Sequence, residues 1–431
     1  MSKYKRYERY KDSGIEWIGE IPEHWEITKL KYICSESAVY GLNESAENYV
    51  EEGVRFIRTT DIDNKGNLDN SMGGVFLPEE KVKGYILKTG DLLVSRSGSL
   101  GTSLYFDEDK YGKCSYAGYL VKFRANSKNC PKFLFYFSKS NIFYIQIQLA
   151  LVSSTISNFN GNKYANMILP LPSYYEQKAI SNFLDQKTAE IDDLIADKEK
   201  LIELLQEKRQ AIITEAVTKG LNPNVKMKDS GIEWIGEIPE HWNTSSLRWY
   251  VSIKSGDFIS QEDIDVEGKI PVIGGNGLMS YTNKTNCNYK TIAIGRVGAL
   301  CGNVHLIRRP SWITDNALFI TNLSNKLYIE YLFYVLKALD LNQYANKTAQ
   351  PLISGSLVKS RIIPIPPIVE QAAIADFLDQ KTAEIDDLIT EIKLQIQKLK
   401  EYRQSFISEA VTGKIDVREF QNKNEVIFRN E

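Results

Sequence analysis

The chain has 431 residues, of which 43% are hydrophobic and 25% are charged, with a net charge of −2. These values predict an ordinary soluble protein of two to four domains and exclude bulk disorder. No stretch approaches the roughly 18 consecutive apolar residues of a membrane span, and the polar N-terminus does not resemble a signal peptide, so we expect a cytoplasmic protein. Five cysteines without a CxxC pair and three histidines predict neither a disulfide framework nor a metal site.

Two long sequence words each occur twice. Residues 12–25 and 229–242 both read DSGIEWIGEIPEHW, and residues 184–195 and 378–389 both read LDQKTAEIDDLI. Such a repeat indicates a tandem duplication. The first pair lies 217 positions apart and the second 194, so constant words frame two inserts of different length.

Short runs of β-branched and aromatic residues between Gly-rich turns predict strands in both inserts. These runs are residues 54–59, 91–95 and 120–123 in the first insert and residues 270–273, 291–294 and 317–320 in the second. DLLVSRSGSLG at 91–101 matches TIAIGRVGALC at 291–301, and KFLFYFSKS at 132–140 matches EYLFYVLKA at 330–338. We infer two mixed α and β domains of one ancestry that have diverged in their loops.

Each insert is followed by a pattern typical of a coiled-coil helix. Apolar residues recur at alternating spacings of four and three, prolines precede each run, and Gly220 and Gly413 follow. The predicted helices have about 42 residues, or roughly 60 Å at a rise of 1.5 Å per residue. The seam residues are Leu184, Ile191, Ile195, Ile202 and Leu205 in the first copy, and Leu378, Ile385, Ile389, Ile396 and Leu399 in the second.

A single helix of this kind would leave its apolar stripe in water, so a partner surface is needed. The economical arrangement is antiparallel pairing of the two helices, with one insert at each end. The alternative is that each stripe packs on its own insert. Antiparallel pairing implies a pseudo-twofold axis, and we expect the chain termini to lie close to the linker at 220–229.

The charges are distributed unevenly along the chain. Residues 26–170 carry 17 basic and 15 acidic side chains, and residues 243–364 carry 13 and 8. The helical segments are acidic, with 7 basic and 10 acidic side chains in 176–220 and 5 and 9 in 370–412. The basic excess of the inserts is compatible with nucleic acid or with ordinary solvated surface.

The WIGEIPEHW openings, the PPxxEQ helix start and the long helices together resemble the specificity subunits of type I restriction-modification systems. The match covers nearly the whole chain, although the first helix starts with SYYEQ at 173–177 instead of the PIVEQ of the second. The resemblance implies an α+β fold with two target-recognition domains separated by two long antiparallel coiled-coil helices. The expected segments are 1–25 (constant), 26–170 (first recognition domain), 171–226 (central helix and linker), 227–364 (constant segment and second recognition domain) and 365–431 (C-terminal helix and tail).

The resemblance also implies a function and partners. Each recognition domain would read one half of a split double-stranded DNA target. The helices, through their seam residues, would set the spacer and dock two methyltransferase subunits, and motor-nuclease subunits would join to restrict DNA. S-adenosylmethionine, ATP and magnesium are expected in the partner subunits and no cofactor in this chain.

Two arginines are the leading candidates for DNA contact. Arg96 and Arg296 each follow a strand and precede a Gly by two positions, and the arginine fork matches O6 and N7 of guanine in the major groove. The small residues Ser95, Ser97 and Gly98 would let backbone approach a duplex. The alternative is a pair of solvated hairpin arginines.

Polar loop residues add weaker candidates. Lys347, Thr348 and Gln350 align with Ser153, Ser154 and Ile156, and Ser154 is included as a candidate. Asn276 lies in GGNGLMS, which we interpret as a turn facing DNA and not as a dinucleotide loop, because the third Gly is missing. The tryptophans and histidines of the constant words, such as His24 and Trp25, are more typical of a constant structural interface.

Motifs for methyl transfer, nucleotide phosphate binding and nucleophilic catalysis are absent from the sequence. We therefore expect a protein without catalytic residues. Two rival hypotheses remain: a self-contained DNA methyltransferase or nuclease whose motifs have drifted, and a coiled-coil scaffold without DNA contact. The missing motifs argue against the first, and the diverged loops in constant frames argue against the second.

Overall fold

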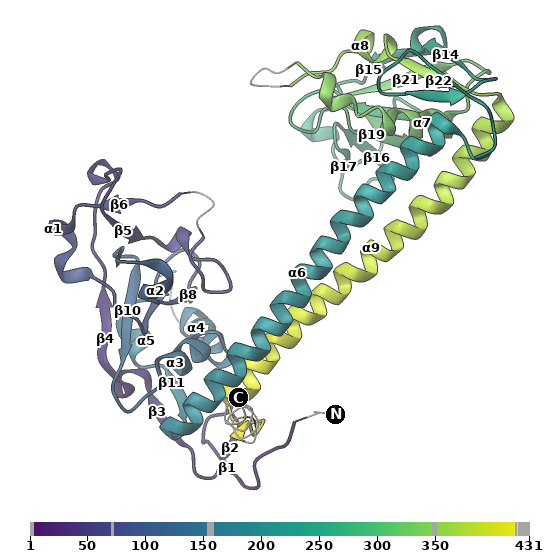
Figure 1. Cartoon of the computed structure of the whole chain (residues 1–431). Helices are drawn as coiled ribbons and strands as arrows, with labels where there is room; N and C mark the ends of the chain where they lie inside the picture. Colours follow the sequence, from purple (N-terminus) through teal and green to yellow (C-terminus); the bar gives the residue numbers. More distant parts are fainter. Residues whose placement is uncertain (1–3, 70–72, 153–158, 347–350, 419, 421–431) are drawn as a thin grey trace. The chain divides into compact units, whose positions relative to one another are not determined.

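The computed structural model describes residues 4–69, 73–152, 159–346, 351–418 and 420 (Figure 1). The chain divides into two compact units. Unit 1 contains Met1–Asp197 and Gln395–Glu431, and unit 2 contains Lys198–Leu394. Two long helices, α6 (Tyr174–Lys219) and α9 (Ile368–Val411), each contribute one end to unit 1 and the other end to unit 2.

Unit 1 is built on two small sheets. One has the strand order β4-β10-β7-β8 and the other the order β6-β5-β9, in which β5 and β9 are parallel. Two further pairs, β1-β2 and β11-β3, connect the constant word to the sheets. The strands are β1 (Tyr10–Asp12), β2 (Glu20–Pro22), β3 (Glu26–Lys29), β4 (Cys34–Tyr40), β5 (Val54–Ile57), β6 (Phe76–Leu77), β7 (Asp91–Ser95), β8 (Ser103–Tyr105), β9 (Cys114–Tyr116), β10 (Leu120–Ala125) and β11 (Ile168–Leu171).

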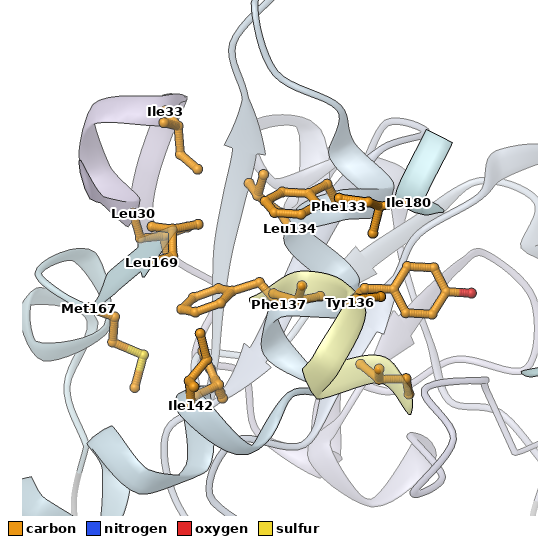
Figure 2. Close-up of a cluster of buried hydrophobic side chains, with 14 of the residues drawn as sticks. Leu30, Ile33, Phe133, Leu134, Tyr136, Phe137, Ile142, Met167, Leu169 and Ile180 are labelled. Carbon is orange, nitrogen blue, oxygen red and sulfur yellow. The ribbon is translucent and has the colours of Figure 1, made fainter. Parts of the chain in front are cut away.

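The main core of unit 1 lies where α3 meets the sheet and the end of α6. Pro131 starts α3 at a position where its missing N–H needs no partner. Figure 2 shows Phe133, Leu134 and Phe137 of this helix packed among Leu30, Leu169 and other buried apolar side chains. The helices here are α1 (Glu79–Val82), α2 (Glu108–Tyr111), α3 (Pro131–Ser138), α4 (Asn141–Val152) and α5 (Gly161–Ala165).

Unit 2 repeats this topology. Its sheets have the orders β15-β21-β18-β19 and β17-β16-β20, with β16 and β20 parallel, and its extra pairs are β12-β13 and β14-β22. The elements are β12 (Met227–Asp229), β13 (Glu237–Pro239), β14 (Asn243–Ser246), β15 (Val251–Ser255), β16 (Ile270–Gly274), β17 (Gly277–Thr282), β18 (Thr291–Gly295), β19 (Val304–Ile307), β20 (Trp312–Ile313), β21 (Ala317–Leu323), α7 (Ile329–Ala338), α8 (Gly355–Lys359) and β22 (Ile362–Ile365). The duplication therefore includes the inserts.

The six predicted strands are confirmed as β5, β7, β10, β16, β18 and β21. Every residue of β7 and β18 is buried. This is the pattern of a central strand covered on both faces, which reads as a continuous apolar run. The predicted similarity of residues 91–101 to 291–301 is confirmed as well, because β7 and β18 occupy the same place in their sheets.

The coiled coil is confirmed within each unit. In unit 1, Phe183 of α6 stacks on Phe406 of α9 and Arg403 bonds to Asp192 at 3.2 Å. In unit 2, the equivalent Arg209 and Asp386 pair at 3.2 Å. As residue numbers rise along α6 they fall along α9, so the helices are antiparallel. The predicted seam residues are buried except Ile202, Leu205 and Leu399, which are half-buried.

The first long helix, which starts with SYYEQ, begins with a capping box formed by Ser173 and Glu176. The Ser173 hydroxyl accepts from the Glu176 backbone N–H at 3.4 Å, and the Glu176 carboxylate accepts from the Ser173 backbone N–H at 3.3 Å. This reciprocal capping box starts α6 without the Pro that precedes α9. Within the described residues, no helix is long and apolar enough to cross a membrane.

The termini and the linker occupy equivalent places in different units. In unit 1, the backbone N–H of Asp416 donates to Lys5 O at 2.8 Å, and the Tyr10 hydroxyl donates to Gly413 O at 2.9 Å. The linker at 220–229 belongs to unit 2. The expectation that the termini lie close to this linker concerns residues of two different units and stays a prediction.

This equivalence predicts that the chain tolerates circular permutation. A variant that starts at Pro223, with the native termini joined, should fold with unchanged protection from hydrogen exchange in both units, since only an exposed loop is opened. A control opened inside α6, at Leu201, should lose protection because it cuts the helix. Equal loss in both permutants would contradict the equivalence of the halves.

Candidate nucleic-acid interface

Arg96 and Arg296 lie at the same end of the two four-stranded sheets. The Arg96 backbone N–H donates to Tyr119 O at 3.0 Å, and that of Arg296 donates to Asn316 O at 2.9 Å. Their carbonyls accept from Phe159 and Ile353, at 3.2 and 2.8 Å. Four matching backbone bonds hold the arginines in equivalent places, as the sequence predicted.

The turns that follow the arginines are open on one side. Gly98 and Gly298 have φ values of +69° and +86°, and a Cβ added to either would meet nothing within 4 Å. Glycine adopts this left-handed conformation without steric cost. No side chain stands on the open side of Gly98 or Gly298, so a large ligand can approach the backbone of these turns.

A second pair of glycines lets the neighbouring strands come together. A Cβ at Gly41 would lie 2.3 Å from Tyr116 O, and one at Gly256 would lie 2.2 Å from Ile313 O. Only glycine fits at these two points. The ends of β4 and β15 therefore lie against the turns before β10 and β21.

The surroundings of the two arginine side chains differ. The Arg96 guanidinium lies 4.9 Å above the ring of Tyr40. Arg296 instead donates through Nη1 to Ser255 Oγ at 3.2 Å and to Asp315 O at 3.3 Å. Cation–π stacking leaves the guanidinium N–H groups unused, whereas the contacts of Arg296 engage one of its nitrogens.

Unit 1 has a hollow lined in part by Tyr119, whose carbonyl accepts from the Arg96 backbone N–H. This pocket has a volume of about 540 Å³, and its wall includes Asn43, Arg58, Thr60 and Tyr119. Tyr119 is 59% exposed, and Arg58 is fixed by Asp61 at 2.8 Å. An exposed ring next to cationic and hydroxyl side chains is a surface suited to nucleotides.

In unit 2, the side-chain amides of two asparagines lie at the corresponding end of the four-stranded sheet. Asn276 is exposed in the turn between β16 and β17, as predicted, and its Oδ1 accepts from Asn303 Nδ2 at 2.8 Å. A Cβ at Gly295 would lie 2.4 Å from Gly275 O. This turn therefore packs directly on the start of the Arg296 loop.

Several predicted site residues are placed differently or are outside the described residues. Ser95 is fully buried and its hydroxyl donates to Ser97 O at 2.7 Å, so its assignment to direct DNA contact is wrong. Ser95 ends β7, a strand in which every residue is buried. Ser97 is half-buried and Gly98 is exposed. The candidates outside the described residues are Ser154, Lys347, Thr348 and Gln350.

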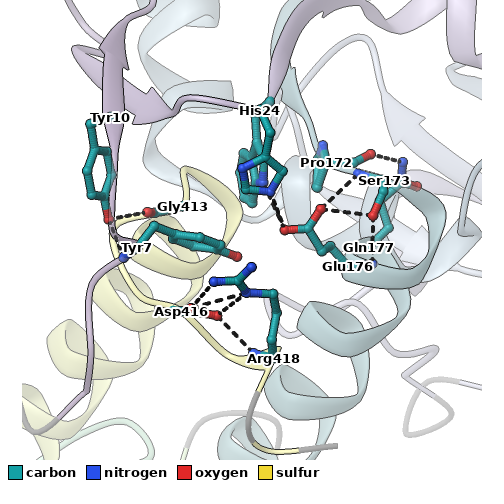
Figure 3. Close-up of polar contacts among 11 residues, drawn as sticks. Tyr7, Tyr10, His24, Pro172, Ser173, Glu176, Gln177, Gly413, Asp416 and Arg418 are labelled. Carbon is teal, nitrogen blue, oxygen red and sulfur yellow. Dashed lines mark hydrogen bonds and ion pairs between the residues drawn. The ribbon is translucent and has the colours of Figure 1, made fainter.

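The constant words form the joints between the helices and the domains, as predicted. Figure 3 shows His24 pointing at Glu176, where the His24 Nε2 to Oε1 distance is 2.8 Å, and the fully buried Trp25 donates to the same oxygen at 3.2 Å. Burial raises the pKa of Glu176, but hydrogen bonds from His24, Ser173 and Trp25 lower it overall. His241, Trp242 and Glu370 repeat the joint in unit 2.

The glutamine of the Glu-Gln pair at the start of each long helix anchors a recognition domain. Gln177 Oε1 accepts from the Cys130 backbone N–H at 2.8 Å, just before α3, and Gln371 Oε1 accepts from the Tyr328 backbone N–H at 2.7 Å, before α7. Both glutamines are buried. A buried amide with satisfied bonds fixes orientation, so each domain is tied to its helix at the same point.

The comparisons with known proteins decide the family. The model of the type I restriction modification DNA specificity domain matches residues 22–204 and 239–398. The chain belongs to this family, as a type I specificity subunit. Seven of the ten seam residues predicted for the coiled coil and for docking are buried, and Ile202, Leu205 and Leu399 are half-buried; docking through them stays a prediction.

Named relatives and solved structures agree with this membership. The putative type I restriction enzyme MjaX specificity subunit of Methanocaldococcus jannaschii is 28% identical over 93% of this chain and 96% of its own length. The EcoprrI specificity subunit of Escherichia coli is 34% identical over 33% of the chain. The fold resembles a chain from a type I R-M complex (TM-score 0.72, 16% identity, 92% and 99% coverage) and the HsdS subunit of Thermoanaerobacter tengcongensis (TM-score 0.52, 17% identity, 92% and 98% coverage).

Proposed function

We propose that this specificity subunit is a non-catalytic reader of a split double-stranded DNA target. The observation that carries this proposal is the pair of matched loop surfaces, in which equivalent backbone positions hold different side chains around Arg96 and Arg296. Sequence-specific readers need a fixed scaffold with variable side chains at base edges. Each recognition domain would read one half-site, and the helices would set the spacer between them.

The partners would be two methyltransferase subunits and, for cleavage, motor-nuclease subunits. Two copies of one partner need two equivalent surfaces. Leu194 and Leu388 occupy the same place in the repeated helix word and are 43% and 48% exposed. Apolar side chains left exposed at matched positions support one methyltransferase per half. S-adenosylmethionine, ATP and magnesium would be bound by the partners.

The proposal predicts that methylation depends on a partner. The purified chain alone should transfer no methyl group and cleave no DNA, and methylation of a bipartite site should appear when the methyltransferase subunit is added. The double variant Leu194→Asp, Leu388→Asp should remove that methylation while circular dichroism stays unchanged, because both leucines are on the helix surface. Methyl transfer by the chain alone would overturn the proposal, and full activity of the double variant would overturn the docking surface.

A further inference from the structure

The matched arginines are unequally available to a ligand. Among the described residues no acceptor binds the Arg96 guanidinium, which is held by the ring of Tyr40 at 4.9 Å. Arg296 is turned toward Ser255 Oγ and Asp315 O, which it contacts at 3.2 and 3.3 Å. Reading a base with both terminal nitrogens of Arg296 would require the Nη1 bonds to break, whereas both terminal nitrogens of Arg96 remain available as donors.

Unit 2 has another pair of side chains suited to a base edge. Asn303 Nδ2 donates to Asn276 Oδ1 at 2.8 Å, which leaves the amide nitrogen of Asn276 as a donor and the amide oxygen of Asn303 as an acceptor. If both amides are rotated by 180°, the pair still has one donor and one acceptor left over. The linked amides therefore present a donor and an acceptor side by side in either orientation.

Bases differ in what they show in the major groove. Guanine offers two acceptors, O6 and N7, which an arginine fork matches with two donors. Adenine offers the acceptor N7 beside the N6 donor, which one donor and one acceptor match. The two sets of side chains thus fit different purines.

We propose that the two recognition domains use different chemistry: Arg96, positioned by Tyr40, reads a guanine in one half-site, and the linked amides of Asn276 and Asn303 read an adenine in the other. This inference rests on the proposed function, because it requires the loop surfaces to face DNA. Arg296 is then a structural residue that joins its loop to Ser255 and Asp315.

The test is binding of the complex with its methyltransferase partner to DNAs randomised in one half-site at a time. Arg96→Ala should reduce the preference for one guanine in its half-site by about 10- to 100-fold. Asn276→Asp replaces the free donor by an acceptor, so the preference for one adenine should fall by a similar factor and shift toward cytosine, whose N4 is a donor. Arg296→Ala should leave the selectivity of both half-sites within about threefold of wild type.

The outcomes separate the inference from the proposed function. If the wild-type complex shows no sequence preference in either half-site, the proposed function fails. If the wild-type complex is selective but Asn276→Asp keeps its adenine preference, or Arg296→Ala loses as much selectivity as Arg96→Ala, the division of chemistry is wrong. Hydrogen exchange should show that the substituted unit of each variant stays folded, which is expected for Asn276→Asp because Asn276 lies in an exposed turn.

Discussion

Replacing Trp25 with alanine is expected to destabilise unit 1 by about 3–5 kcal/mol, the usual cost of removing a buried tryptophan. The side chain is fully buried, its Nε1 donates to Glu176 Oε1 at 3.2 Å, and a Cβ added at Gly413 would lie 3.1 Å from its ring. The substitution would leave a cavity where the constant word, α6 and the end of α9 meet. It would also remove one donor from a buried carboxylate.

Trp242→Ala should have the same effect on unit 2, because Trp242 is also fully buried and donates to Glu370 Oε2 at 3.0 Å. Trp249, which is 74% exposed, supplies the control, and its replacement by alanine should change stability little. Hydrogen exchange resolved by segment is the appropriate measurement, since a chain of two units need not unfold in one step. Loss of protection in both units after either substitution alone would contradict the independence of the two joints.

Gly413→Ala is the second substitution with a large expected effect. Gly413 has a φ of +71°, and an added Cβ would lie 2.4 Å from Cδ of Pro22. The backbone conformation costs an alanine about 1–2 kcal/mol, and the forced overlap adds about 1–3 kcal/mol. Unit 1 should therefore be less stable by several kcal/mol.

Alanine substitutions at two other glycines separate the cost of the left-handed backbone from the cost of the steric overlap. Gly220 has a φ of +74° and a Cβ there would lie 3.1 Å from the Trp242 ring, whereas Gly14 has a φ of +73° with nothing within 4 Å. The alanine variants should rank Gly413, Gly220 and Gly14 in decreasing loss of stability in denaturant unfolding. Equal losses at all three positions would show that the contact with Pro22 contributes nothing.

Local patterns were sufficient to predict the main elements. The apolar runs of β7 and β18 and the heptads of α6 and α9 carry their signal within a few neighbouring residues, because burial imposes a period on the sequence. Short strands such as β8 and β9 were not predicted. Each has three residues and exists because a neighbouring strand pairs with it.

The site was predicted less completely, because the surroundings of its residues also depend on contacts between segments far apart in the sequence. The equivalence of Arg96 and Arg296 follows from alignment, but their surroundings do not. Tyr40 and Ser255 come from strands about 40 to 55 positions away in sequence and reach the arginines only through the sheets. The amide of Asn303 likewise meets Asn276 through the packing of two turns, so sequence spacing alone did not indicate it.

The duplication leaves the first half of the molecule dependent on a segment that is synthesised after the second half. The core of unit 1 includes Phe406, Ile407, Ala410 and Val411, and Tyr10 bonds to a residue 403 positions later. Unit 2, by contrast, is a continuous segment that is complete once Leu394 has left the ribosome. Although domains usually fold from the N-terminus during translation, here the second half completes first, and the nascent first half must keep apolar surface uncovered until residues 406–411 have been synthesised.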